Sequence, residues 1–168
     1  MPDETGHIEI SDYVNVATRT AELGCRYPEG LALLPVNFDS ASSFPELLQA
    51  SEAATIRKLL KAERLPLDEL DESQRTRYVK NKSRDFVAPV MFVGSLLWSQ
   101  NPDAVSLALN VIGNYATAFF QGDSGHHEVH LEVVVEKKKN ETYKKISYRG
   151  PAAGLRDVNS VMREVMDD

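Results

Sequence analysis

The chain has 168 residues, of which 42% are hydrophobic and 26% are charged. This length suits one domain with a proper core, and the composition is that of an ordinary globular protein, which excludes disordered and collagen-like classes. The net charge of −6 disfavours nucleic acid or an anionic membrane as the main partner. The lone cysteine, Cys25, cannot form an internal disulfide and the acidic N-terminal sequence lacks the apolar run of a signal peptide, so we expect a cytoplasmic protein.

The N-terminal part of the chain predicts two helices and one strand. The Ser-Asp pair at residues 11–12 is a capping sequence for a helix that ends at Gly24, because glycine readily adopts the left-handed conformation that closes a helix. The continuous apolar run at residues 31–38 is typical of a buried strand. The Ser-Phe-Pro-Glu sequence at residues 43–46 indicates the start of a second helix.

The segment at residues 65–85 changes in character, with acidic residues first and basic residues after them. We expect an exposed connection inside a single domain that spans residues 1–168. The plainer interpretation is a solvated segment whose opposite charges satisfy one another, and the alternative is an electrostatic docking segment for a partner protein or for RNA. The candidate interaction residues in it are Arg75, Arg77 and Lys80.

The stretch at residues 86–122 contains one charged residue, Asp103. Its uncharged runs at residues 86–98 and 104–120 predict two helices, and both are shorter than the about 20 apolar residues of a membrane span. The Asn-Pro-Asp sequence before the second run is typical of a helix start. That helix is apolar on most of its circumference, so we expect it to lie at the centre of the core. Part of its apolar surface is expected to contribute to an interface with another chain. The candidate interface residues are Tyr115, Phe119 and Phe120.

The C-terminal part predicts a hairpin and a last helix. Residues 127–136 alternate between apolar and polar side chains, and a turn leads from them into a second strand at residues 142–149. Residues 152–166 carry an apolar stripe at helical spacing. The fold class is therefore predicted as α+β: a single compact domain whose small antiparallel sheet, with the C-terminal hairpin, packs against about five helices. The hairpin is expected to present an exposed edge.

The candidate metal ligands of the sequence are His126, His127 and His130, with carboxylates near them. Imidazole and carboxylate groups bind zinc or iron, but the spacing fits no strong template, and the plainer interpretation is a solvated strand face. No catalytic residue and no cofactor is assigned. The sequence favours a non-enzymatic interaction or oligomerisation module, a subunit of a larger cytoplasmic assembly that forms homo-oligomers or binds a protein partner. The alternative is a small metal-dependent hydrolase that uses this histidine cluster.

Overall fold

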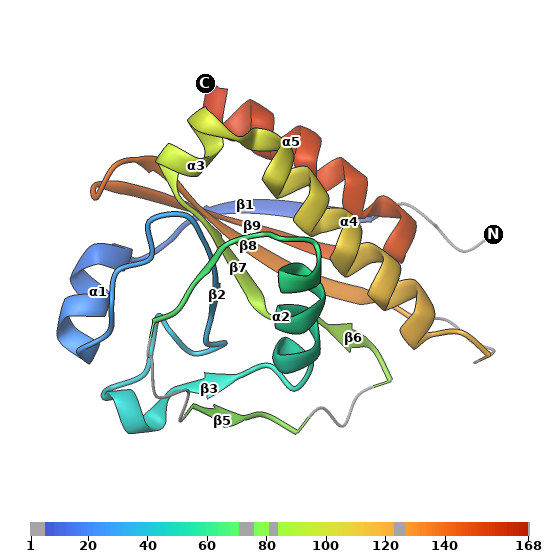
Figure 1. The fold of residues 1–168 in the computed structure, drawn as a ribbon, viewed down its shortest axis with the longest axis horizontal. Coiled ribbons are helices and arrows are strands. Elements are labelled where there is room, and N and C mark those ends of the chain that lie inside the picture. Colours follow the sequence, from blue (N-terminus) through green and yellow to red (C-terminus); the bar gives the residue numbers. More distant parts are fainter. Residues whose placement is uncertain (1–5, 71–75, 81–83, 123–126, 168) are drawn as a thin grey trace.

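The computed structural model of the chain describes residues 6–70, 76–80, 84–122 and 127–167. Within these ranges the largest feature is a seven-stranded sheet with the order β1-β9-β8-β7-β2-β4, and β6 pairs with β8 beside this path. Its strands are β1 (His7–Asp12), β2 (Leu31–Leu34), β4 (Leu67–Asp68), β6 (Phe86–Val87), β7 (Val90–Val93), β8 (Val129–Lys138) and β9 (Thr142–Gly150). Two short strands, β3 (Leu48–Gln49) and β5 (Arg77–Tyr78), form a separate parallel pair at the side of the molecule (Figure 1).

The helices lie on both faces of the large sheet. Helices α4 (Pro102–Phe119) and α5 (Leu155–Asp167) run side by side over one face, which also receives α2 (Ala53–Ala62) (Figure 1). Helix α1 (Val16–Leu23) packs on the opposite face, where it contributes to a second, smaller core. The short helix α3 (Ser95–Gln100) connects β7 to α4. The middle strands of the sheet are therefore covered on both sides.

The α+β class and the five predicted helices agree with the described residues, but the predicted small antiparallel sheet is wrong. Strand β8 runs parallel to β7 and β6, and β2 runs parallel to β4, so the sheet is mixed. The error arises at residues 86–98, predicted as a helix, which form β6, β7 and part of α3. Met91 and Val93 face the core under α4, whereas Val90 and Phe92 face the core under α1. A run that is buried on both faces has no apolar period that separates strand from helix.

The N-terminal elements also differ from their prediction. Residues 7–12 form β1, and α1 begins only after Asn15, whose side chain caps its first turn. The predicted helix end at Gly24 is confirmed, since this glycine has a φ of 71° in the left-handed region. The second helix begins at Ala53, because residues 43–46 provide only a short 3-10 turn before it.

The C-terminal hairpin is confirmed as β8 and β9, which pair antiparallel. Its expected exposed edge is wrong, because β1 pairs antiparallel with the outer side of β9 along all of its six residues. In the described ranges the strand order ends at β1 on one side and at β4 on the other, and β6 pairs with β8 alone. The Ser-Asp pair at residues 11–12, predicted to cap a helix, is therefore the end of an edge strand.

Helix α4 is the centre of the larger core. Ala108, Ile112 and Ala116 are fully buried along it, and it contacts α2, α3 and α5. This agrees with the prediction made from its apolar circumference. None of the helices in the described ranges combines the length and the apolar character that a membrane crossing requires.

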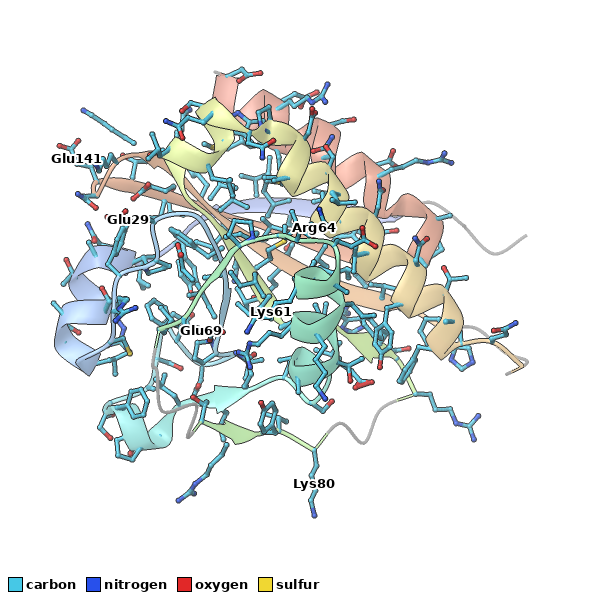
Figure 2. All side chains as sticks on the ribbon, viewed as in Figure 1. Glu29, Lys61, Arg64, Glu69, Lys80 and Glu141 are labelled. Carbon is cyan, nitrogen blue, oxygen red and sulfur yellow. The ribbon has the colours of Figure 1, made fainter. Side chains whose placement is uncertain are left out.

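The charged segment at residues 65–85 is packed at its start. Asp68 Oδ2 accepts two backbone N–H groups from the loop before β2, at 2.9 and 2.7 Å. Glu69 Oε1 lies 3.6 Å from Lys61 Nζ on α2, and Figure 2 shows both side chains between α2 and this segment. Lys80 instead extends away from the body of the molecule (Figure 2). Residues 71–75 and 81–83 lie outside the described ranges.

Candidate functional site

The sheet carries polar side chains on part of the face opposite to α4 and α5. Side chains of directly opposed residues in antiparallel strands point to the same face, so the pairing of β1, β9 and β8 places them in rows. The first row is His7-Arg149-His130 and the second is Glu9-Ser147-Glu132. Their neighbours Leu131 and Tyr148 point the other way, into the larger core. These rows line a shallow, open groove.

At the β8 end of this face, three potential metal ligands come together: Asp85, Glu128 and His130. Asp85 directly precedes β6 and Glu128 directly precedes β8, and these strands are parallel and adjacent, so the two carboxylates meet where the strands begin. His130 is in β8, two positions after Glu128, and points to the same side. The backbone N–H of Glu128 donates to Asp85 Oδ1 at 3.1 Å, which fixes the Asp85 carboxylate beside β8.

The three side chains are partly buried and their ligand atoms lie within 4.8 Å of one another. His130 Nε2 is 3.3 Å from Asp85 Oδ2 and 3.5 Å from Glu128 Oε2. Nε2 is buried, yet within the described residues neither contact has the alignment of a hydrogen bond. Arg149 Nε lies 3.8 Å from Glu128 Oε2. The arrangement is an imidazole held against two carboxylates, a donor set able to bind a cation.

This cluster shares one histidine with the sequence-predicted ligand set. His127 instead stacks on Phe120, with ring centroids 4.8 Å apart and an interplanar angle of 8°. His126 lies outside the described residues. Asp85 was missed by sequence reasoning, because it is 45 positions from His130 and only the pairing of β6 with β8 brings them together. The one local signal in the sequence is that Asp85 stands at the start of an apolar run. That position does not indicate which distant residues Asp85 contacts.

The interface residues predicted on α4 contribute to packing at its C-terminal end. The rings of Tyr115 and Phe119 meet Phe86 edge to face, at centroid distances of 5.5 and 5.3 Å. The hydroxyl of Tyr115 donates to Glu52 Oε1 at 3.1 Å. Phe119 keeps 41% of its surface exposed, so it is both a packing residue and part of the surface. Phe120 serves as the stacking partner described above.

Two of the charged interaction residues, Arg77 and Lys80, are described and lie in or just after β5. Arg77 is in β5 and is exposed, as is Lys80, which follows the strand. Arg75 lies outside the described residues. Neighbouring Tyr78 and Val79 are also exposed, so this side of the molecule presents both apolar and basic groups.

Glu136 on β8 is a second unusual carboxylate, 3% exposed. It accepts hydrogen bonds from the Tyr27 hydroxyl, from the backbone N–H and the hydroxyl of Ser95 at 2.9 and 2.8 Å, and from the Asn140 N–H at 3.1 Å. Burial by itself raises the pKa of Glu136, but these hydrogen bonds favour the ionised form and leave the pKa below its ordinary value. Burial and the hydrogen bond to Glu136 raise the pKa of Tyr27. Since its oxygens are already occupied by donors of the chain, Glu136 is structural.

The outer edge of β1 is the remaining feature. The N–H of Tyr13 donates to the carbonyl of Tyr143 at 3.1 Å, so the odd-numbered residues of this strand are the ones that exchange backbone hydrogen bonds with β9. Ile8, Ile10 and Asp12 therefore direct their N–H and C=O groups away from the sheet. No strand of the described ranges lies on that side.

Comparison with known proteins finds no matching family model, no matching curated protein and no matching solved structure.

Proposed function

We propose that the protein is a non-enzymatic interaction module that forms a homodimer by pairing β1 with β1 of a second copy. The observation that carries this proposal is the row of outward N–H and C=O groups at Ile8, Ile10 and Asp12. An edge of this kind readily accepts a strand of another chain. Two identical strands related by a two-fold axis pair antiparallel and close the assembly.

The strand has few of the features by which natural edges avoid such pairing. Its sequence, HIEISD, contains neither lysine nor proline. Its register with β9 runs from His7 to Asp12 without a bulge. Lysine, proline and bulges are common ways to block an edge, so β1 is regular enough to continue the sheet into a partner.

The pairing register follows from the outward positions. If Ile10 lies opposite Ile10 of the partner subunit, then Ile8 lies opposite Asp12, and every outward group of the strand is used. If the two-fold axis passes through Glu9 instead, the pairing uses only Ile8 and Ile10 and sets two glutamates opposite each other. Like charges in direct opposition are destabilising in a sheet. The register centred on Ile10 is therefore the favoured one.

The side chain of Ile10 supports the same register. It is 51% exposed, the largest exposed fraction among the large hydrophobic side chains of the described residues together with Leu96. Its pairing partner Ile146 is fully buried in the larger core, so Ile10 stands at the border of that core. Two Ile10 side chains at the axis would cover each other and extend the core across the interface.

The proposal places the dimer in the cytoplasm as a subunit of a larger assembly. A chain with a single cysteine needs no oxidising compartment, and the net charge of −6 favours a protein partner over nucleic acid. The exposed Arg77, Tyr78 and Lys80 would then be available to a further protein partner.

Light scattering at micromolar concentration tests the proposal, using the chain mass of 18.7 kDa as the reference. Ile10→Pro removes the N–H at the axis, and because this N–H points outward, the pairing of β1 with β9 keeps its hydrogen bonds. Ile10→Lys keeps the N–H and sets two positive charges at the axis. Both variants should be folded monomers, whereas wild type and Ile10→Val should be dimers. A monomeric wild type, or dimers in both disruptive variants, would contradict the proposal.

A further inference from the structure

We propose that Asp85, Glu128 and His130 bind a divalent first-row transition-metal ion, with zinc as the probe. This site goes beyond the proposed dimer, because it is built on β6 and β8 and uses no group of β1. It contains His130 of the sequence-predicted histidine cluster and takes two carboxylates in place of the other two histidines.

The spacing of the donor atoms fits a common ion. Zinc binds imidazole nitrogen and carboxylate oxygen at about 2.0 to 2.2 Å, and two such ligands in a tetrahedral arrangement lie about 3.3 to 3.5 Å apart. His130 Nε2 is 3.3 Å from Asp85 Oδ2 and 3.5 Å from Glu128 Oε2. Both nitrogen–oxygen distances therefore equal the separation expected between two ligand atoms that bind the same zinc ion.

The alignment of the imidazole favours an ion over a simple ion pair. A protonated His130 paired with a carboxylate would direct its N–H at an oxygen, but Nε2 is buried and has no hydrogen bond within the described residues. His7 provides the contrast, since its Nε2 makes a hydrogen bond with Glu9 Oε1 at 3.0 Å on the exposed part of the same face. A metal ion placed between Nε2 and the two carboxylates would satisfy the buried nitrogen.

The backbone holds the donors in place. The N–H of Glu128 binds Asp85 Oδ1, which turns the other oxygen, Oδ2, toward His130. Strand pairing of Phe86 with Val129 places the backbones of Asp85 and Glu128 beside each other. Hydrogen bonds that orient a ligand in this way are typical of metal sites.

The donor types indicate the class of ion. Two carboxylates neutralise the charge of a divalent cation, and a neutral imidazole suits zinc, iron or nickel better than calcium or magnesium, which prefer oxygen ligands throughout. Three protein ligands leave a coordination position for water or for a ligand. The partial exposure of all three side chains gives that position access to the solvent.

Isothermal titration calorimetry with zinc chloride and the full-length chain, without a histidine tag, tests the site. Wild type should bind about one zinc ion per chain. Asp85→Asn keeps the acceptor for the Glu128 N–H but loses the charge, and Glu128→Gln provides a second variant. Loss of an outer-shell partner alone costs about 10- to 100-fold in metal affinity, so each of these variants should bind zinc at least that much more weakly.

Matched controls are His7→Gln and Glu141→Gln, which remove an exposed histidine and an exposed carboxylate outside the cluster. Both should keep the wild-type affinity, and calcium chloride should give no binding at the same site. Equal zinc affinity in wild type, Asp85→Asn and Glu128→Gln would overturn the proposal. So would a loss of binding on replacing His127 that the Asp85 and Glu128 variants do not share.

Discussion

Ser95 donates both its backbone N–H and its hydroxyl to one oxygen of Glu136, Oε1, at 2.9 and 2.8 Å. The other oxygen accepts from the Tyr27 hydroxyl and from the N–H of Asn140 in the hairpin turn. One buried carboxylate thus connects the start of α3, the loop before β2 and the tip of the hairpin. These three places are far apart in the sequence.

Replacing this carboxylate should be costly. Glu136→Gln removes the charge and turns an amide donor toward donors already in place, so we expect a loss of about 3 kcal/mol in the free energy of unfolding. Urea denaturation followed by circular dichroism measures it. Glu141→Gln is the control on the same turn, where an exposed ion pair with Lys138 contributes at most about 1 kcal/mol. Equal stabilities of the two variants would show that the Glu136 contacts contribute nothing.

The same carboxylate predicts a dependence on pH. The pKa of Glu136 is lower in the folded protein than its ordinary value of 4.5, so the unfolded chain takes up the proton at a higher pH. The stabilisation is therefore complete above the ordinary pKa and is lost as the pH falls through the folded pKa. Wild type should lose stability below about pH 4.5 more steeply than Glu136→Gln. Parallel stability curves in that range would contradict this assignment.

Two glycines should respond differently to alanine. A Cβ on Gly94 would lie 2.0 Å from the carbonyl oxygen of Glu29, a backbone atom that cannot turn aside, so we expect Gly94→Ala to cost about 3 kcal/mol or more. Gly24 has open space around it, and only its φ of 71° penalises a side chain, by about 1 to 2 kcal/mol. Thermal unfolding of both variants measures the order. If Gly94→Ala were more stable than Gly24→Ala, the end of β7 and the loop at Glu29 would have to be further apart than in this structure.

Helix α4 offers a matched pair of leucines. Leu109 is 3% exposed in the larger core, whereas Leu107 is 36% exposed on the same helix. Leu109→Asp buries an unpaired charge and should prevent folding, with a cost above about 4 kcal/mol, while Leu107→Asp should remain folded. Circular dichroism distinguishes the two. A folded Leu109→Asp protein would show that α4 is not the centre of the core.

The sequence predicts those elements that carry a local signal. The hairpin has alternating apolar residues on β8, Gly24 supplies the left-handed helix end, and the Asn-Pro-Asp sequence starts α4. Strand β7 has no such signal, because it is buried on both faces and is apolar at every position. The sequence of β1 does alternate, with Ile8 and Ile10 between polar residues, but the adjacent Ser-Asp pair led to a helix prediction.

The candidate metal site is only partly visible in the sequence for a physical reason. His130 and Glu128 are two positions apart, so Glu128 is among the carboxylates that the sequence places near the candidate histidines. Asp85 reaches them through the parallel pairing of β6 with β8, a contact between distant segments that no local period encodes. The outward groups of β1 depend in the same way on which positions of the strand pair with β9.

A disulfide across the two-fold axis tests the β1 dimer most directly. In the register centred on Ile10, the Cα atoms of the two Ile10 residues form a hydrogen-bonded pair about 5.5 Å apart, within the range that a disulfide spans. In a Cys25→Ser background, Ile10→Cys should therefore form covalent dimers under mild oxidation, while Glu9→Cys, which faces Ser11 of the partner subunit, should remain monomeric on a non-reducing gel. An Ile10→Cys protein that stays monomeric, or a Glu9→Cys protein that crosslinks equally well, would contradict dimerisation through β1 in this register.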